Sequence, residues 1–376
     1  MSEKIADIES ILERITDAWN YYFLENKFCQ TKINYNDEVK TNYYGDILSY
    51  FHDTLSFLCI NQAHLGRKES IFNSISLLQI IYAQQDLVDE LLYIFKLPAS
   101  LKEDKNPNRN IRNELVGHPI RRLNDQLISS VFFGNEFKGN VIHYIIYSKD
   151  NNFRLKEEIL NVEKIIDRHL DFLVKYLEII ISKINVVLNQ LRKKLASILL
   201  MLNEDISFVD LLNVVIHNYE KIFEDNKLFK PNLLREVYLR VDEHPRYKNV
   251  INIFHIALQS YIEDAKKSID SISLYKATGM EDLVIPKVVI KIVKQKNTQN
   301  KKSVKRRYFD YEFSKLFEKH PIFEINYFIE KFSNDVSIMD ELQNMKKFIG
   351  NELEYYSSYE YLRVIMTEKG LLNRQF

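Results

Sequence analysis

Apolar side chains recur at intervals of three and four residues along most of this chain, which is the spacing of an amphipathic helix. Such stripes predict helices over residues 5–23, 38–61 and 69–96. A longer stripe follows over 155–202. It predicts a dimerisation arm, a connector between domains, or two helices separated by a kink.

Helical spacing continues through the second half of the chain, with no evident internal repeat. Residues 131–148 differ, because they are aromatic and β-branched and include Gly134 and Gly139, a composition that fits one strand of a short β-hairpin. The helices predicted for the second half cover 206–229, 246–275, 308–319, 322–349 and 352–369.

Residues that break helices are scarce. The 376 residues include only 8 glycines and 7 prolines, and residues 140–230 contain neither. Because 46% of the residues are hydrophobic, the chain can bury one large core or two ordinary ones. We therefore predict an all-α fold with two domains. The first covers 1–203 and includes the long connecting helix, and the second covers 204–376 and is also helical.

Charge and cysteine usage narrow the class of protein. Lysine plus arginine and aspartate plus glutamate both total 52, so a nucleic acid would have to bind a local basic patch. Two cysteines exclude a disulfide framework and a four-cysteine zinc site. The first residues do not resemble a signal peptide, and lysines and arginines interrupt the apolar stretch 176–202 before it reaches membrane-spanning length. These features predict a soluble, cytoplasmic protein that does not bind a membrane.

The segment Arg112-Asn113-Glu114-Leu115-Val116-Gly117-His118-Pro119 concentrates the chemistry of the chain. The planar fork of donors on an arginine matches a phosphate, and a histidine can exchange protons near neutral pH. The amide of Asn113 can orient either group. No other segment combines these side chains so closely.

The position of His118 relative to Arg112 depends on where the helix ends. Asn106-Pro107 predicts a helix that begins near residue 107. Gly117 and Pro119 interrupt this helix, so we expect His118 at a helix–loop junction. Six residues along an ideal helix would turn the two side chains about 120° apart. A break near Gly117 can bring both to one pocket.

A polar run, Gln84-Gln85-Asp86, interrupts the apolar stripe of the 69–96 helix. Gln85 falls on the stripe itself, where an unpaired amide costs about 1–3 kcal/mol. One interpretation is a core glutamine with a satisfied partner. The other is that this helix packs beside the Arg112 segment and that Gln85, Asp86 or Glu90 supports the arginine.

Residues 287–307 carry nine basic side chains and no acid, and Tyr308 and Phe309 follow directly. Proteins bind single-stranded RNA with such combinations of basic and aromatic side chains, because the cations contact the phosphate backbone and the rings stack on the bases. The alternative is a solvated loop. The five cations nearest the two aromatic residues are Lys301, Lys302, Lys305, Arg306 and Arg307.

Motifs of other enzyme classes are not found. The sequence has no HExxH, P-loop, GxSxG or GxGxxG, and its nine histidines have no metal-ligand spacing with the two cysteines. We therefore expect neither a cofactor nor a metal site. His244 and His320 also precede prolines, but without an arginine six residues upstream, and are interpreted as helix-end histidines.

The segment RNELVGHP resembles the signature of the HEPN superfamily of helical ribonucleases and nucleotide-binding domains, and YAQQDLVDELL is similar to the helix that precedes it. The resemblance covers about residues 1–203. It implies a helical bundle that pairs face to face, so that two motifs form one composite cleft. Many such proteins are metal-independent endoribonucleases of toxin–antitoxin, phage-defence or RNA-processing systems, and some are inactive adaptors.

Carried onto this chain, the resemblance implies that Arg112 neutralises the scissile phosphate, that His118 acts as acid or base and that Asn113 holds the arginine or the substrate. Glu114 could pair with His118 or only contact solvent. Additional phosphate contacts are expected from Arg109, Arg121 and Arg122.

The sequence thus predicts a homodimeric endoribonuclease that binds RNA, with an antitoxin or another regulatory protein as a further partner. The alternatives are a non-catalytic RNA- or nucleotide-binding adaptor of the same fold, and a helical scaffold in which Arg112 and His118 are buried beside a carboxylate.

Overall fold

In the computed structural model the chain divides into two compact units, Met1–Gln190 and Leu191–Phe376. The boundary lies inside one long helix, ahead of the boundary expected at residue 203. The described residues are 2–41, 43–59, 67–98, 108–133, 140–204, 206–224, 226–278, 308–317 and 321–373.

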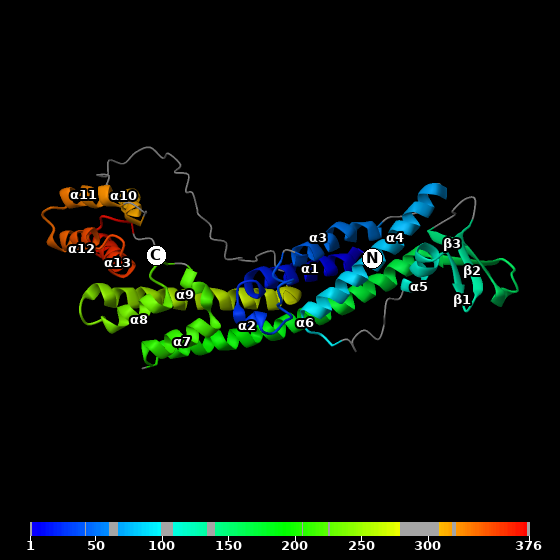
Figure 1. Ribbon diagram of the computed structural model, residues 1–376, viewed down its shortest axis with the longest axis horizontal. Helices are drawn as coiled ribbons and strands as arrows, with labels where there is room; N and C mark the ends of the chain where they lie inside the picture. The colour runs from blue at the N-terminus through cyan, green and yellow to red at the C-terminus, as the bar shows by residue number, and fades with distance from the viewer. Residues whose placement is uncertain are drawn as a thin grey trace. The chain divides into compact units, whose positions relative to one another are not determined.

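The first unit contains long helices and a small antiparallel sheet (Figure 1). Its elements are α1 (Ser2–Ala18), a π-helical turn η1 (Trp19–Phe23), α2 (Lys27–Gln30), α3 (Tyr43–Leu55), η2 (Ser56–Cys59), α4 (Arg67–Ile94), α5 (Arg109–Arg112), a π-helical turn η4 (Asn113–Gly117), β1 (Ile120–Leu123), β2 (Gln126–Phe132), β3 (Val141–Ser148), η5 (Lys149–Asn151), β4 (Lys156–Asn161) and α6 (Val162–Leu202).

The predicted apolar stripes form the core of this unit. Ile8, Leu12 and Ile15 of α1 are fully buried, as expected from their spacing. A short polar chain crosses the same interior, where Gln84 of α4 donates to Thr54 Oγ1 at 2.9 Å and its Oε1 lies 2.8 Å from Nε2 of His169 on α6. Burial lowers the pKa of His169 to about 3, so this imidazole is neutral in the fold.

The sheet is larger than the predicted hairpin, with the strand order β1-β2-β3-β4. Asn124 and Asp125 connect β1 to β2 with φ values of 48° and 62°, the conformation of a type I′ turn. The predicted helix over 155–202 is wrong at its start, because residues 156–161 form β4 and the helix begins at Val162. Leu155 and Ile159, assigned to its apolar stripe, are 65% and 63% exposed.

The second unit is helical in its described part, as predicted. Its elements after α6 are α7 (Phe208–Asn218), η6 (Glu220–Glu224), α8 (Pro231–Leu239), α9 (Pro245–Thr278), α10 (Asp310–Ser314), η7 (Lys315–Phe317), α11 (Ile322–Lys331), α12 (Val336–Lys347) and α13 (Glu352–Glu368).

Phenylalanines and other large apolar side chains of α10 to α13 form a separate core in this unit. Ser207 at the start of α7, Asp335 at the start of α12 and Asn351 at the start of α13 each accept a hydrogen bond from a backbone N–H of the first turn. The fold as a whole is mostly helical, and all-α is correct except for the sheet.

Candidate functional site

One face of α4 carries three side chains that hold the arginines of the motif. Gln79, Tyr82 and Asp86 follow one another at intervals of three and four residues, so they share one side of the helix. The short helix α5 and the turn η4 carry Arg109 and Arg112 opposite this side. The amide of Gln79 therefore contacts Arg112, the ring of Tyr82 contacts both arginines, and the carboxylate of Asp86 contacts Arg109.

Arg112 is fixed by neutral groups. Its Nε and Nη2 donate to Oε1 of Gln79 at 3.1 and 3.0 Å, and its Nη1 donates to Oδ1 of Asn113 at 3.2 Å. The guanidinium carbon lies 4.3 Å from the centre of the Tyr82 ring. Among the described residues no carboxylate lies within ion-pair distance of Arg112. Its positive charge is oriented but not neutralised.

Arg109 contacts the same ring but has a counterion. Its guanidinium carbon is also 4.3 Å from the centre of Tyr82, and its Nη2 lies 2.6 Å from Oδ1 of Asp86. Burial acts against the charged form, but the contacts with Tyr82 and Asp86 raise the pKa of the guanidinium above its ordinary value. Two cations thus share one aromatic ring and one carboxylate, which leaves a net positive charge.

The helix that holds Arg112 ends in a wide π-turn at Gly117, as the sequence predicts. The backbone N–H of His118 donates to the carbonyl of Asn113 at 2.7 Å, and His118 has φ −140° and ψ 62°, outside the helical region. A Cβ atom on Gly117 would lie only 2.9 Å from Nη1 of Arg112. The tip of Arg112 therefore packs on the residue that precedes the exposed His118.

Strand β1 separates the two arginines that follow the motif. Arg121 donates from Nη1 to the carbonyl of His118 at 3.3 Å, and its Nη2 lies 3.7 Å from Oε1 of Glu114. Arg122 points to the opposite side of the strand, because side chains alternate, and donates to the carbonyl of Asp125 at 3.3 Å. Only Arg121 faces the motif, and Arg122 lies on the other side of β1.

The supporting contacts also differ from those expected. Asp86 binds Arg109 instead of Arg112, and Glu114 accepts from Ser130 Oγ at 2.7 Å instead of pairing with His118. Gln85 is fully buried, and its amide has no hydrogen-bond partner among the described residues. Glu90 accepts from Tyr43 at 2.8 Å. None of the three supports expected from α4, which were Gln85, Asp86 and Glu90, contacts Arg112, whereas Asn113 does.

The sequence interpretation missed Gln79 and Tyr82, which contact Arg112 directly. The available signal was their spacing from Asp86, since the three lie on one side of the same helix. The polar run at 84–86 drew attention to the next turn instead. Lys301, Lys302, Lys305, Arg306, Arg307 and the start of the motif helix near Pro107 lie outside the described residues.

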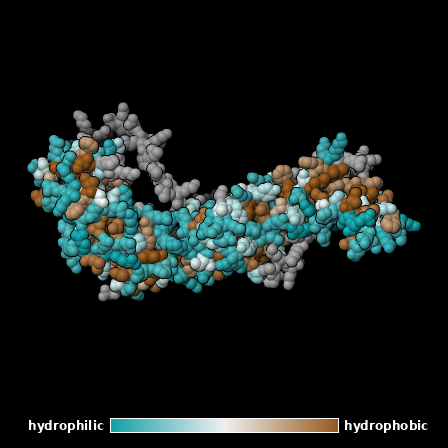
Figure 2. All heavy atoms as spheres, in the orientation of Figure 1, coloured by the Kyte–Doolittle hydropathy of each residue, from teal (hydrophilic) through white to brown (hydrophobic). Residues whose placement is uncertain are grey.

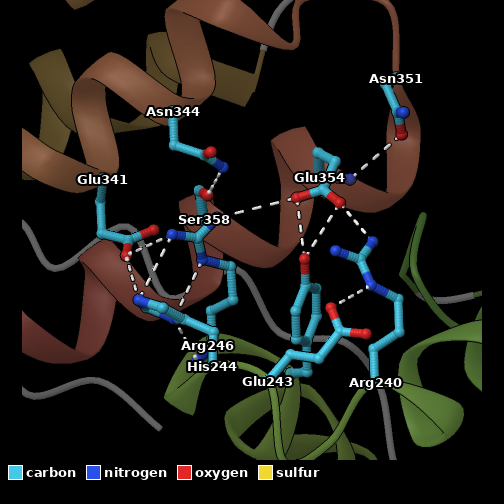
Figure 3. Close-up of polar contacts among 10 residues, drawn as sticks. Arg240, Glu243, His244, Arg246, Glu341, Asn344, Asn351, Glu354 and Ser358 are labelled. Carbon is cyan, nitrogen blue, oxygen red and sulfur yellow. Dashed lines mark hydrogen bonds and ion pairs between the residues drawn. The ribbon is translucent and has the colours of Figure 1, made fainter.

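A second polar cluster lies in the C-terminal unit, where α8, α9, α12 and α13 meet (Figure 3). Arg246, in the first turn of α9, lies 3.2 Å from Oε1 of Glu341 and 3.7 Å from Oε2 of Glu354. Glu354 also pairs with Arg240 at 2.5 Å and accepts from the hydroxyl of Tyr247 at 3.0 Å. This cluster connects the pair α8 and α9 to the pair α12 and α13.

Burial and charge pairing shift the pKa values of the two glutamates of this cluster in opposite directions. Burial opposes ionisation of Glu354, but hydrogen bonds from Arg240 and Tyr247 hold its pKa below the ordinary value. For Glu341 burial prevails over the attraction of Arg246, and its pKa is raised. Because every arginine here has a carboxylate partner, the cluster joins helices and offers no free cation to a ligand.

His244 is a helix-end histidine, as predicted. Its Nδ1 accepts from the backbone N–H of Arg246 at 3.2 Å, directly before α9. His320 lies outside the described residues. Within the described ranges no three histidine, cysteine, aspartate or glutamate side chains come together as a metal site. None of the described helices has the length and apolar character needed to cross a membrane.

Comparisons with known proteins add no relative. No family model matches this chain, and searches of curated proteins and of solved structures found no match. The resemblance to the HEPN superfamily therefore stays a prediction from the motif. Any argument about function depends on the geometry of Arg112, His118 and the residues around them.

Proposed function

We propose that this protein is a metal-independent endoribonuclease that cleaves RNA by attack of the 2′-hydroxyl on the neighbouring phosphate. The observation that carries the proposal is Arg112, a cation held in place by Gln79, Asn113 and Tyr82, all uncharged. His118, an exposed proton-transfer group, is one residue from the glycine on which the arginine packs.

The free donors of Arg112 suit a phosphate. A guanidinium has five N–H groups. Three of them are used by Gln79 and Asn113, which leaves two for a ligand. Two parallel N–H groups are what a bidentate contact with phosphate oxygens requires. Because the partners of Arg112 are neutral, its charge is available to stabilise the extra negative charge that develops in the transition state.

His118 supplies the proton transfers. The 2′-oxygen attacks phosphorus and loses its proton to a base, while the bond to the 5′-oxygen breaks and that oxygen receives a proton from an acid. The products are a 2′,3′-cyclic phosphate and a 5′-hydroxyl. One chain provides one such histidine, so a site with both an acid and a base fits two chains that bring two motifs together.

The surrounding residues strengthen the contact with RNA. Arg109 stacks on the same ring as Arg112, and Arg121 is held beside His118. Both are placed to bind neighbouring phosphates. An unrestrained ribonuclease of this kind would stop growth, which suits a toxin or phage-defence effector in the cytoplasm under the control of a second molecule.

A non-catalytic RNA-binding adaptor is the second candidate, because the same uncompensated cation would serve binding alone. The scaffold alternative expects a carboxylate beside Arg112 and a buried His118. Among the described residues Arg112 has no such partner, and His118 is exposed. Catalysis is therefore the property to test.

The test is incubation of the purified chain with single-stranded RNA in EDTA, followed by analysis of the fragment ends. We expect cyclic 2′,3′-phosphate and 5′-hydroxyl ends, and no cleavage of DNA or of RNA carrying 2′-O-methyl groups. Arg112→Ala and His118→Ala should each lower the rate by about 10²–10³-fold or more. Arg168→Ala, which removes an exposed arginine of α6 in the same unit, is the matched control and should cleave normally.

Two results would contradict the proposal. Cleavage that stops in EDTA would show that the chemistry depends on a metal ion. Binding of RNA without cleavage by the wild-type chain, with affinity lost in the Arg112→Ala variant, would favour the adaptor. Circular dichroism and the elution volume of each variant exclude misfolding as the cause of a lost activity.

A further inference from the structure

The side of α4 that holds the motif arginines continues beyond them toward the start of the helix. Ile75 and Phe72 lie four and seven positions before Gln79, so they share its side of the helix. Their exposed fractions are 37% and 69%. Every other exposed position of the helix between Lys68 and Asp86 is polar. We call Ile75 and Phe72 the apolar pair, which interrupts an otherwise polar surface.

The motif runs along α4 in the opposite direction and leads toward the apolar pair. Arg109 donates to Asp86, whereas Arg112 donates to Gln79, seven positions earlier in α4. A forward step in the motif is therefore a step toward the start of α4. The turn η4 also packs on α4 and leads from Arg112 to His118. The apolar pair is thus the next surface of α4 beyond the contacts of Arg112.

Cations lie on both sides of the apolar pair. At 1.5 Å per residue, Phe72 is about 10 Å along the helix from Gln79, which holds Arg112, and about 6 Å from Lys68. Lys68 is exposed on the same side, whereas the neighbouring Glu69 lies about 100° farther around the helix. Figure 1 shows the first turns of α4 extending beyond α3, and in Figure 2 hydrophobic side chains gather there below a hydrophilic tip. The helix thus presents, in order, a cation, an apolar surface with one aromatic ring, and a second cation.

This order of groups matches an unpaired RNA strand, in which phosphates and bases alternate. Proteins that bind single-stranded nucleic acid stack bases on exposed aromatic rings and contact the backbone with cations beside them. A stable interface with a second protein uses about 800 Å² from each partner. Two partly exposed side chains provide only a part of that area, whereas one ring is enough for one base. The apolar pair therefore suits a base better than a protein.

We propose that a base of the RNA strand stacks on Phe72, next to the phosphate that Arg112 binds. Ile75 widens the apolar surface on the side of the motif. Both faces of a base inside a duplex are covered by its neighbours, so stacking on Phe72 requires an unpaired base. The site thus selects single-stranded RNA. The identity of the strand rests on the proposed ribonuclease function, but the stacking can be measured on a strand that is not cleaved.

Fluorescence anisotropy with a short 2′-O-methyl oligouridylate tests the stacking, because this strand lacks the attacking 2′-hydroxyl. Phe72→Ala should weaken binding by about 5- to 150-fold, the range for the loss of one stacked base. Phe72→Trp should bind as tightly as the wild type. Tyr93→Ala is the matched control, because Tyr93 is a 50% exposed aromatic residue of the same helix, about 21 Å beyond Gln79. The control should bind normally.

Two further measurements separate stacking from an indirect effect on the fold. A strand of the same length without bases should bind equally to the wild type and to Phe72→Ala, because only its phosphates are left to contact. Phe72→Ala should also leave the dependence of affinity on salt unchanged. Lys68→Ala should lower the slope of log affinity against log salt by about 0.7, as expected for one phosphate contact on a single strand.

Several results would overturn this assignment. They are equal affinity of the wild type and Phe72→Ala for the oligouridylate, an equal loss on the strand without bases, and an unchanged salt slope for Lys68→Ala. A change of mass for Phe72→Ala in light scattering would place Phe72 in a contact between chains instead. Binding that depends on Phe72 without RNA cleavage by the wild type would support the stacking and contradict the ribonuclease. RNA cleavage that does not depend on Phe72 would do the reverse.

Discussion

Replacement of Gly117 by alanine should disable the candidate site while the fold stays intact. The added Cβ would lie 2.9 Å from Nη1 of Arg112, whereas ordinary contacts begin near 3.4 Å. The backbone of Gly117 does not have a positive φ, so alanine fits the main chain without strain. The neighbour that must yield is the end of the arginine side chain.

The size of the effect follows from what the arginine must give up. A retreat of about half an ångström or more lengthens the hydrogen bond of 3.2 Å from Arg112 to Asn113 and tilts the pair to Gln79. These are partly exposed contacts worth about 0.5–1.5 kcal/mol each, so the free energy of unfolding should fall by no more than about 2 kcal/mol. Misplacement of a catalytic group by about 1 Å costs up to about 10²-fold in rate. We expect a loss of cleavage between tenfold and a hundredfold.

The assay compares four chains in a mutant cycle: wild type, Gly117→Ala, Arg112→Ala and the double variant. Cleavage of a labelled RNA in EDTA is measured for each chain, together with its urea unfolding curve. If Gly117 acts through Arg112, the alanine has little further effect once the arginine is absent. An unchanged rate for Gly117→Ala, or an equal loss in both backgrounds, would refute this reasoning.

Three further predictions follow from other contacts. Gln79→Glu places a carboxylate against Arg112, so it should neutralise the guanidinium and weaken RNA binding, as measured by fluorescence anisotropy. The free energy of unfolding in urea should not fall. An unchanged affinity for RNA would contradict the role of the free charge on Arg112. Burial lowers the pKa of His169 to about 3 in the folded protein. Below about pH 6.5 the unfolded chain therefore binds a proton at this histidine and the folded chain does not. The free energy of unfolding should fall by about 1.4 kcal/mol for each pH unit as the pH is lowered from about 6 to 4. His169→Gln should flatten that fall, and an equal slope in denaturant titrations at several pH values would exclude this histidine as the cause. Glu354→Ala leaves Arg240 without its buried partner and should lower the free energy of unfolding by roughly 3 kcal/mol, with a control at the exposed Glu243 costing less than about 1 kcal/mol.

Much of the helical architecture is determined locally and could be predicted from the sequence. Spacing of apolar residues predicts α1, α4 and α9, because one stripe must be buried whatever its neighbours are. The end of the motif helix at Gly117 was predictable for the same reason, since glycine and the proline two residues later act on the chain beside them.

The start of α6 was not predictable in this way. Leu155 and Ile159 continue the helical spacing of the residues that follow, and nothing in their local sequence excludes a helix. Pairing with β3 decides the matter, because the backbone of 156–161 finds its hydrogen bonds across the sheet. The partners of β4 lie 10 to 20 residues earlier in the chain, from Ile146↔Lys156 to Val141↔Asn161, so the spacing of apolar residues within β4 itself does not reveal the pairing.

The sequence by itself determined which chemical groups this protein has. It also placed Arg112 and Asn113 near the end of a helix and His118 at the junction between that helix and the following loop. Only the tertiary structure decided that Gln79 holds the arginine, that Asp86 holds Arg109 instead, and that no described carboxylate neutralises Arg112. The physical reason is that these contacts join residues 23 and 33 positions apart, so they depend on how α4 packs against α5. Periodicity specifies the faces of each helix, and packing alone selects which faces meet.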